Sequence, residues 1–418
     1  MVNTTAISRV KKLTLASTAV LLLILAQPTL QGAGPHTGLV DLDMDPFLKE
    51  DEIKLDLKDK TMNQVTLEDL IELPHIKPIY KAVAATHLIS NLILDFCWLG
   101  KTMVLHDDFL AMFIRQYGVQ QDKFEEALDT EAMLRKIYPT ADKPKIEMFT
   151  HRAWFSSPWN PVEIFEYLPN KTYFDRMLDT NKILDSEGYK WTHIIWTNDK
   201  TLTPKTFKWF EDNGMIVKEF KELPYDKLVH DKFNEYIEEG NFGKAIDITK
   251  GYTSYHYGGM YLDLDVFISA WTNKWLHNFD SIWIRELDIK FGMAIFNNDL
   301  YLTKSKHPVF EKWLEIFHAQ YAVSVDKQPI QQSKCMNQTN AKTPYEAGIH
   351  MTMVAWVLEY GKYDTADIAL YPKNTIRPQK YKIRVSETET VVYPIQGNSI
   401  YICSWMDNYG DALVFGFS

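Results

Sequence analysis

Residues 258–266 of this chain read GGMYLDLDV, and this stretch decides how the rest of the sequence is interpreted. Apolar and polar residues alternate from Met260 to Val266, which is the period-two pattern of a half-buried β-strand. On such a strand Asp263 and Asp265 point to the same side, about 6–7 Å apart. That spacing lets one carboxylate bind a hard cation while the other accepts hydrogen bonds from a bound ligand. The two glycines favour a helix C-cap and leave room for a ligand to approach the backbone.

The segment just before the glycine pair, residues 243–257, has the pattern of a helix. Asp247 and Lys250 are three residues apart and therefore share one face of that helix. An Asp-x-Asp sequence alone occurs often by chance. A helix with a charged pair, then two glycines, then an acidic strand is a much rarer combination. The sequence therefore predicts a functional site where this helix and strand meet.

Residues 244–250, KAIDITK, and 257–265, YGGMYLDLD, together resemble the sugar-binding region of DXD-type glycosyltransferases. That superfamily includes yeast-type initiating α-1,6-mannosyltransferases, inositol-phosphoceramide mannosyltransferases and the catalytic domains of large clostridial glucosylating toxins. Its pattern is roughly Ser-Asp-x-x-Arg followed by Tyr-x-x-Gly-Gly-x-Tyr-x-Asp-x-Asp. Lys250 stands where the family usually has arginine, so the charge is kept but the two-pronged guanidinium geometry is lost.

Two further segments resemble the strands that hold the nucleotide in this superfamily. Residues 145–155, KIEMFTHRAWF, resemble a first strand that ends in Ile-His-x-x-Trp. In relatives that tryptophan lies against the nucleotide base, so Trp154 is the expected base-stacking residue, and a core position is the alternative. Residues 191–199, WTHIIWTND, resemble the neighbouring strand. The resemblance implies that Asn198 contacts the base or ribose, although Asn-Asp after an apolar strand also makes a good turn.

The C-terminal segment 401–405, YICSW, resembles the closing loop of the superfamily, which ends in Ser-Trp. In relatives this loop contacts the donor phosphate and covers the site, and the resemblance therefore assigns that role to Ser404 and Trp405. Many relatives carry a histidine shortly before the pair. Ile400 and Tyr401 stand there in this chain, so the sequence offers no metal ligand from that position.

The resemblance covers about residues 144–418 and implies an α/β, GT-A-like nucleotide-diphospho-sugar transferase fold with a Rossmann-like mixed sheet. Residues 282–284 and 291–296 are expected strands, and Asn297 and Asn298 follow at a strand end where they could meet the donor or acceptor sugar. The formal charge of −10 argues against a nucleic-acid-binding surface. The chain has no Walker loop and no Gly-x-Gly-x-x-Gly after a strand, so other residues must bind the nucleotide.

The N-terminal segment has the features of a targeting signal. Basic residues precede an uncharged apolar stretch from Leu13 to Ala26, which is shorter than the roughly 20 residues of a bilayer span. We therefore expect residues 1–33 to be a signal peptide, with an uncleaved signal anchor as the alternative. Either would direct the protein to the secretory pathway, as a Golgi lumen or type II membrane protein or as a secreted one. Residues 34–143 are expected to form a separate N-terminal helical region.

Breaking a sugar–nucleotide bond leaves a diphosphate with extra negative charge, which a divalent cation stabilises. Oxygen ligands suit Mn²⁺ or Mg²⁺. Asp265 is the expected metal ligand, and Asp263 would hold the ribose or donor sugar and reach the metal through water. The resemblance also implies retention of the anomeric configuration. The predicted donor-binding residues are Trp154, Asn198, Asp247, Lys250, Tyr261, Asp263, Asn297, Ser404 and Trp405.

These features predict an enzyme that moves a hexose from a UDP- or GDP-sugar to a glycan, glycolipid or protein acceptor. One alternative is a secreted effector that glycosylates a host protein, as the clostridial toxins do. Another is a relative that binds nucleotide sugars without catalysis. The two carboxylates and the Ser-Trp pair favour an enzyme.

Overall fold

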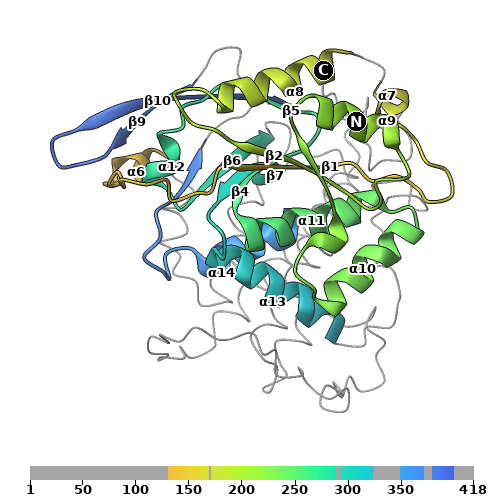
Figure 1. The fold of residues 1–418 in the computed structure, drawn as a ribbon. Coiled ribbons are helices and arrows are strands. Elements are labelled where there is room, and N and C mark those ends of the chain that lie inside the picture. The colour runs from red at the N-terminus through yellow and green to blue at the C-terminus, as the bar shows by residue number, and fades with distance from the viewer. Residues whose placement is uncertain (1–129, 169–170, 289–292, 323–348, 371–378, 400–418) are drawn as a thin grey trace, which may run out of the picture.

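The computed structural model describes residues 130–168, 171–288, 293–322, 349–370 and 379–399 (Figure 1). The helices are α6 (Thr130–Arg135), α7 (Ile164–Tyr167), α8 (Lys171–Leu184), α9 (Pro204–Asp212), α10 (Lys227–Glu238), α11 (Phe242–Tyr257), α12 (Trp275–Asn278), α13 (Pro308–Ala322) and α14 (Ile349–Glu359). The strands are β1 (Phe149–Ala153), β2 (Thr192–Thr197), β3 (Ile216–Glu219), β4 (Gly259–Leu262), β5 (Val266–Ala270), β6 (Ser281–Asp288), β7 (Met293–Thr303), β8 (Asp367–Leu370), β9 (Gln379–Arg384) and β10 (Thr390–Ser399).

The central sheet has seven strands in the order β3-β2-β1-β4-β7-β6-β8. Strands β1 to β4 are parallel, β7 is antiparallel to both of its neighbours, and β8 is parallel to β6. The mixed α/β sheet predicted from the sequence is therefore confirmed. A second, antiparallel sheet has the order β5-β10-β9.

Helices cover both faces of the central sheet: α7, α8 and α9 lie on one face, and α10, α11, α13 and α14 lie on the other (Figure 1). The change of face follows from the strand order, because the chain winds outward from β1 to β3 and then crosses back to β4. The order therefore reverses between β1 and β4. In open α/β sheets, ligands bind outside the carboxyl ends of the strands at such a reversal.

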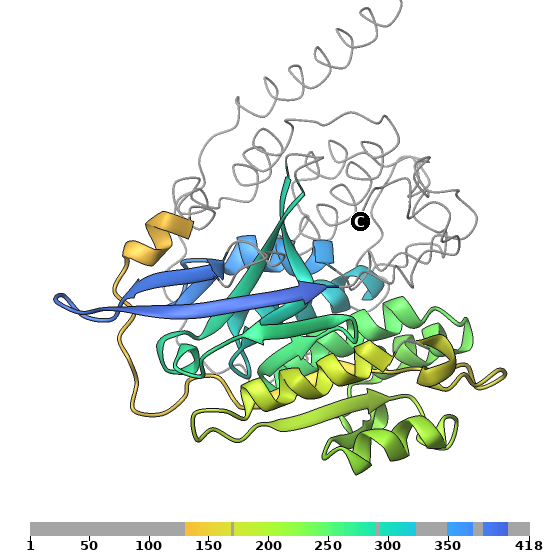
Figure 2. The same ribbon diagram turned by 90° about the horizontal axis from the view of Figure 1, so that it is seen from above.

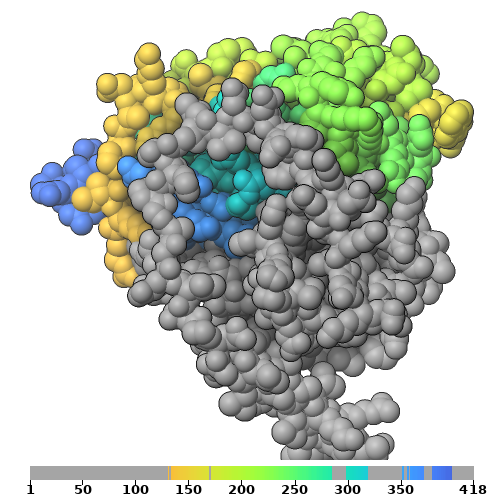
Figure 3. Space-filling view, turned by 90° about the horizontal axis from the view of Figure 1, so that it is seen from below, coloured from red at the N-terminus to blue at the C-terminus, as the bar shows by residue number. Residues whose placement is uncertain are grey.

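The hairpin formed by β9 and β10 projects from one side of the body, with α6 beside it (Figures 2 and 3). The chain after α6 is fixed to the body by backbone hydrogen bonds. Tyr138 N–H donates to the Arg384 carbonyl at 2.8 Å, and Ala141 N–H donates to the His277 carbonyl at 2.9 Å. The last residues of the predicted N-terminal region are thus anchored to the body, while most of that region lies outside the described residues.

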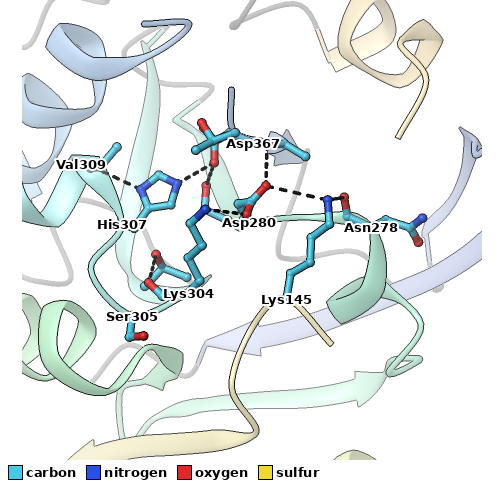
Figure 4. Close-up of polar contacts among 12 residues, drawn as sticks. Lys145, Asn278, Asp280, Lys304, Ser305, His307, Val309 and Asp367 are labelled. Atoms are coloured by element: carbon cyan, nitrogen blue, oxygen red, sulfur yellow. Dashed lines mark hydrogen bonds and ion pairs between the residues drawn. The ribbon is translucent and has the colours of Figure 1, made fainter. Parts of the chain in front are cut away.

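A buried polar cluster joins the first residues of β6 and β8 to the chain that follows β7 (Figure 4). Lys304 Nζ lies 2.7 Å from Asp280 Oδ1, and His307 Nε2 lies 2.8 Å from Asp367 Oδ1. Ser281 Oγ donates to the same Asp367 oxygen at 2.6 Å. Because β6 runs parallel to β4, this cluster lies at the edge of the sheet opposite the carboxyl ends of β1 and β4.

None of the helices in the described ranges is long and apolar enough to cross a membrane. The predicted signal segment from Leu13 to Ala26 lies outside those ranges, as do Ser404 and Trp405. Predictions about these segments therefore stay predictions.

Candidate active site

The acidic motif lies in a turn between two strands. β4 ends at Leu262, and Val266 N–H donates to the Asp263 carbonyl at 3.0 Å, which closes a turn before β5. The prediction of one continuous strand from Met260 to Val266 is therefore wrong. The reason is that β4 pairs within the central sheet whereas β5 pairs with β10, so the chain must change direction between them. Asp263 and Asp265 remain at the carboxyl end of β4 but do not share a strand face.

The glycine pair is required by packing. Gly258 caps α11 with φ 64° and donates to the Ser254 carbonyl at 3.1 Å, and Gly259 has φ 92°. A Cβ atom at Gly258 would collide with the Glu147 carboxylate, and one at Gly259 with the Phe149 carbonyl oxygen. The expected C-cap is confirmed, but the expected space for a ligand is filled by protein. The glycines allow the end of α11 to pack closely against β1.

Four of the predicted site residues meet beside the acidic turn. Lys250, on α11, places its Nζ 3.0 Å from Asp263 Oδ2 and 3.5 Å from Asp247 Oδ1. The same ammonium lies 5.2 Å from the centre of the Tyr261 ring. Lys250, Asp247 and Tyr261 are buried, and Asp263 is half-buried. The helix and the end of β4 thus form one charged cluster, as the i, i+3 spacing predicted.

Burial and charge fix the ionisation of this cluster. Burial raises the pKa of Asp247 to about 7; Lys250 opposes this effect and the charge of Asp263 adds to it. Burial acts to lower the pKa of Lys250, but the charges of Asp263 and Asp247 outweigh it, so the pKa is raised. Burial, followed by the charge of Asp263, raises the pKa of Tyr261 well above its usual value. At neutral pH, Lys250 is charged, Tyr261 is neutral and Asp247 titrates.

Asn298 completes the cluster from the neighbouring strand. Its Nδ2 donates to Asp247 Oδ1 at 2.9 Å, while the buried Asp247 Oδ2 has no hydrogen-bond partner among the described residues. Asn297 and Asn298 lie within β7, so their predicted position at a strand end is wrong. A bulge causes the difference, because residues 297–300 of β7 stand opposite Ile284 alone. Sequence periodicity carries no signal for such a bulge.

Two more of the predicted donor-binding residues, Trp154 and Asn198, lie after β1 and β2. Trp154 is half-buried and follows β1 directly, with its ring 5.6 Å from that of Tyr167. The Asn198 side chain accepts from Ser156 N–H at 3.1 Å and donates to the Ser156 carbonyl at 2.9 Å. Asn198 therefore holds the loop that follows Trp154, a role that the sequence did not indicate. Direct contacts of either residue with a nucleotide stay predictions.

These elements lie along one edge of the central sheet. β1, β2 and β4 are parallel neighbours, so the residues that follow their carboxyl ends all face the same edge. The reversal of strand order between β1 and β4 lies among them. Trp154, Asn198 and the acidic turn therefore occupy the position where open α/β sheets bind ligands.

The acidic turn has the chemistry for a hard cation. Among the described residues no group of three or more His, Cys, Asp or Glu side chains could hold a metal ion. Ions such as Mg²⁺ are commonly held by one or two carboxylates together with substrate phosphates and water. The carboxylates of Asp263 and Asp265 fit that donor set, with the remaining ligands supplied by a bound diphosphate and water.

No protein-family model matches the chain, and no curated protein matches its sequence. Similar solved structures include the PaToxG glycosyltransferase, at 16% identity, with 60% of this chain and 82% of that chain covered and a TM-score of 0.39. The UDP-bound glycosyltransferase domain of the YGT toxin has 10% identity, with 54% and 79% covered and a TM-score of 0.35. The catalytic domain of alpha-toxin from Clostridium novyi has 8% identity, with 72% and 81% covered and a TM-score of 0.32.

The first two of these structures are named as glycosyltransferases, which is the class of enzyme whose motifs this chain resembles. The arrangement of the site rests on the residues of this chain alone.

Proposed function

We propose that this chain is a metal-dependent, retaining glycosyltransferase with a GT-A-like fold. It moves a hexose from a UDP- or GDP-sugar to a glycan, glycolipid or protein acceptor. The observation that carries the proposal is the buried cluster of Asp247, Lys250 and Asp263 at the carboxyl end of β4. This cluster joins the two halves of the sugar-binding motif at the edge where open α/β sheets bind ligands.

Asp247 is the proposed receptor for a hydroxyl group of the donor sugar. Lys250 and Asn298 hold its Oδ1, and its buried Oδ2 has no partner among the described residues. A buried acceptor without a hydrogen bond destabilises the protein, so a ligand hydroxyl that donates to Oδ2 gains the full value of that bond. The ionised carboxylate is the stronger acceptor, and it is the main form above pH 7.

Asp265, with Asp263, is proposed to hold Mn²⁺ or Mg²⁺. Such an ion would stabilise the charge that develops on the leaving diphosphate. Lys250 keeps Asp263 in one position through its 3.0 Å contact, and that contact also reduces the negative charge at the turn. Asp263 would therefore link Asp247 and Lys250, which are proposed to bind the sugar, to Asp265, which is proposed to bind the metal.

Trp154 is proposed to stack on the base, and Ser404 and Trp405 to contact the donor phosphate. The register of the second sheet supports the latter role, since Ser399, the last residue of β10, pairs with Val266. Val266 directly follows Asp265 in the sequence, and Ser404 and Trp405 come five and six residues after Ser399. The apolar N-terminal stretch supports action in the secretory pathway, in the Golgi or after secretion.

The test is hydrolysis of nucleotide sugars by the full chain without an acceptor. UDP-glucose, UDP-N-acetylglucosamine and GDP-mannose are incubated with the protein in Mn²⁺ and in EDTA, and free nucleoside diphosphate is measured. We expect turnover of one donor class in Mn²⁺ and loss of turnover in EDTA. Absence of both hydrolysis and nucleoside diphosphate binding for every donor would overturn the proposal. Binding without hydrolysis or transfer would identify a non-catalytic relative.

A further inference from the structure

The first turns of α8 lie next to the acidic turn. α8 follows β1 in the chain and leads back to β2, so its N-terminal half lies at the same edge as the carboxyl end of β1. Ile268 N–H donates to Thr180 Oγ1 at 3.0 Å, which fixes the helix against β5. Because β5 begins directly after the acidic turn, residues nearer the start of α8 are directed toward the acidic turn.

Tyr173 and Arg176 form the part of α8 that contacts β5 just after this turn. They are three residues apart and share one side of the helix. Both contact Phe267: the Tyr173 ring lies 6.1 Å from the Phe267 ring, and the Arg176 guanidinium carbon lies 5.9 Å from its centre. Phe267 comes two residues after Asp265. A phenol and a guanidinium therefore lie beside the carboxylate that we assign to the metal.

Electrostatics agree with this placement. Burial is the main cause that raises the pKa of Tyr173, and the charge of Asp265 raises it further, while the charge of Arg176 opposes the shift. Asp265 and Arg176 are therefore both within electrostatic reach of the Tyr173 hydroxyl.

Arg176 has the properties of an anion-binding residue. Its side chain is exposed, and no carboxylate pairs with it among the described residues, although the nearby lysines of α8 are paired with aspartates. The guanidinium lies over the Phe267 ring, and a cation–π contact that holds it there reduces the conformational entropy lost when it binds an anion. A guanidinium presents a planar fork that matches phosphate oxygens.

We propose that Arg176, assisted by the Tyr173 hydroxyl, binds the diphosphate of the nucleotide on the side of the acidic turn that faces α8. The inference rests on the proposed function and names a phosphate-binding wall for the same site. The diphosphate is the anionic group that the carboxylates of the turn would hold through a cation. The Arg176 guanidinium would bind phosphate oxygens that do not contact the cation and would neutralise their negative charge.

The test is calorimetric titration of the full chain with UDP and GDP in Mn²⁺, at two salt concentrations. Arg176→Gln should weaken binding of the preferred diphosphate by about 10-fold or more, the loss typical of a hydrogen bond to a charged group. The affinity of the Arg176→Gln variant for the diphosphate should also fall less steeply with increasing salt concentration than that of the wild type. Tyr173→Phe should weaken binding by about 2–5-fold, as for a neutral hydrogen bond.

Lys182→Gln is the matched control, since Lys182 is exposed on the same helix and is paired with Asp179 at 3.0 Å. It should bind the diphosphate as tightly as the wild type. Equal affinity and equal salt dependence of wild type and Arg176→Gln would overturn the inference and leave the proposed function standing. Absence of binding by the wild type to both UDP and GDP would overturn both.

Discussion

In the part of the chain that the structure describes, two buried charged clusters lie at opposite edges of the central sheet, and their hydrogen-bonding groups are satisfied to different degrees. In the cluster of Figure 4, Asp367 accepts from His307 and Ser281 through Oδ1 and from Thr365 through Oδ2. In the cluster beside β4, Asp247 has one oxygen held and the other without a partner in the described structure. A saturated network stabilises the fold, whereas an unsaturated one retains the capacity to bind a ligand.

The ionisation of the two aspartates reflects the same difference. Burial acts to raise the pKa of Asp367, but His307 and the hydroxyl donors outweigh it, so the pKa is lowered. Burial dominates at Asp247 and raises its pKa to about 7. The pKa values of these two buried aspartates are therefore shifted in opposite directions. Only Asp247, at the edge where β1 and β4 end, is costly to ionise.

The largest effect is expected at the acidic turn. Asp265→Asn keeps the size of the side chain and removes its charge, so donor hydrolysis in Mn²⁺ should fall by about 100-fold or more, while the unfolding temperature stays close to that of the wild type. Asp212→Asn is the control, because Asp212 is exposed and pairs with Lys208 on α9. Wild-type turnover of Asp265→Asn at low Mn²⁺ would remove Asp265 from the site.

The saturated cluster should show the reverse result. Asp367→Ala leaves His307, Ser281 and Thr365 without their acceptor and should lower the free energy of unfolding by about 3–5 kcal/mol, as for a broken buried pair. Urea unfolding measures this loss. Donor affinity of the folded fraction should be unchanged. A variant as stable as the wild type but unable to bind nucleotide would reverse the roles of the two clusters.

A change at the predicted base-stacking residue should weaken nucleotide binding. Trp154→Ala should weaken the affinity for free nucleoside diphosphate by about 1–3 kcal/mol, the value of base–aromatic stacking in other systems. Calorimetry measures this change. Trp159→Ala is the control, since Trp159 is 82% exposed on the loop that follows Trp154. Unchanged affinity of Trp154→Ala, with a loss of stability, would make Trp154 a packing residue.

The smallest expected effect is a difference in pH dependence. The folded-state pKa of Asp247 is raised above its model-compound value, so its contribution to stability is full below about pH 3.8 and is lost as the pH rises to about 7. The pKa of Asp367 is lowered, so its contribution is present above about pH 3.8 and is lost as the pH falls below that value. Comparing wild type with Asp247→Asn should show a stability difference that changes between pH 4 and 7. A flat difference over that range would place Asp247 in a solvated setting.

Sequence patterns predicted the local parts of the site. The spacing of Asp247 and Lys250 is a property of one helix, and the contact of both with the residues after the glycine pair follows from chain connectivity. The turn at Asp263 could not be predicted in this way. The alternation of residues 260–266 suits a strand, and only the pairing of β5 with the distant β10 forces the chain to bend.

Contacts made across the sheet were also hidden from the sequence. Asn298 reaches Asp247 because β7 bulges against β6, and Arg176 lies over Phe267, just after the acidic turn, because α8 packs on β5. Both depend on partners far away in the sequence. Trp154 and Asn198 were located because a motif marks the end of a strand, and the contact of Asn198 with Ser156 appears only in the structure.

The pairing of β5 with β10 has a consequence for folding. It joins residues more than a hundred positions apart, and such long-range pairings form slowly because the intervening chain must first be brought together. A fragment that ends before β10 would still carry the entire Asp-x-Asp motif but would lack the strand that supports one side of its turn. The strand that follows the motif therefore pairs with chain synthesised long after it, and the nascent protein cannot form this pairing until β10 has emerged.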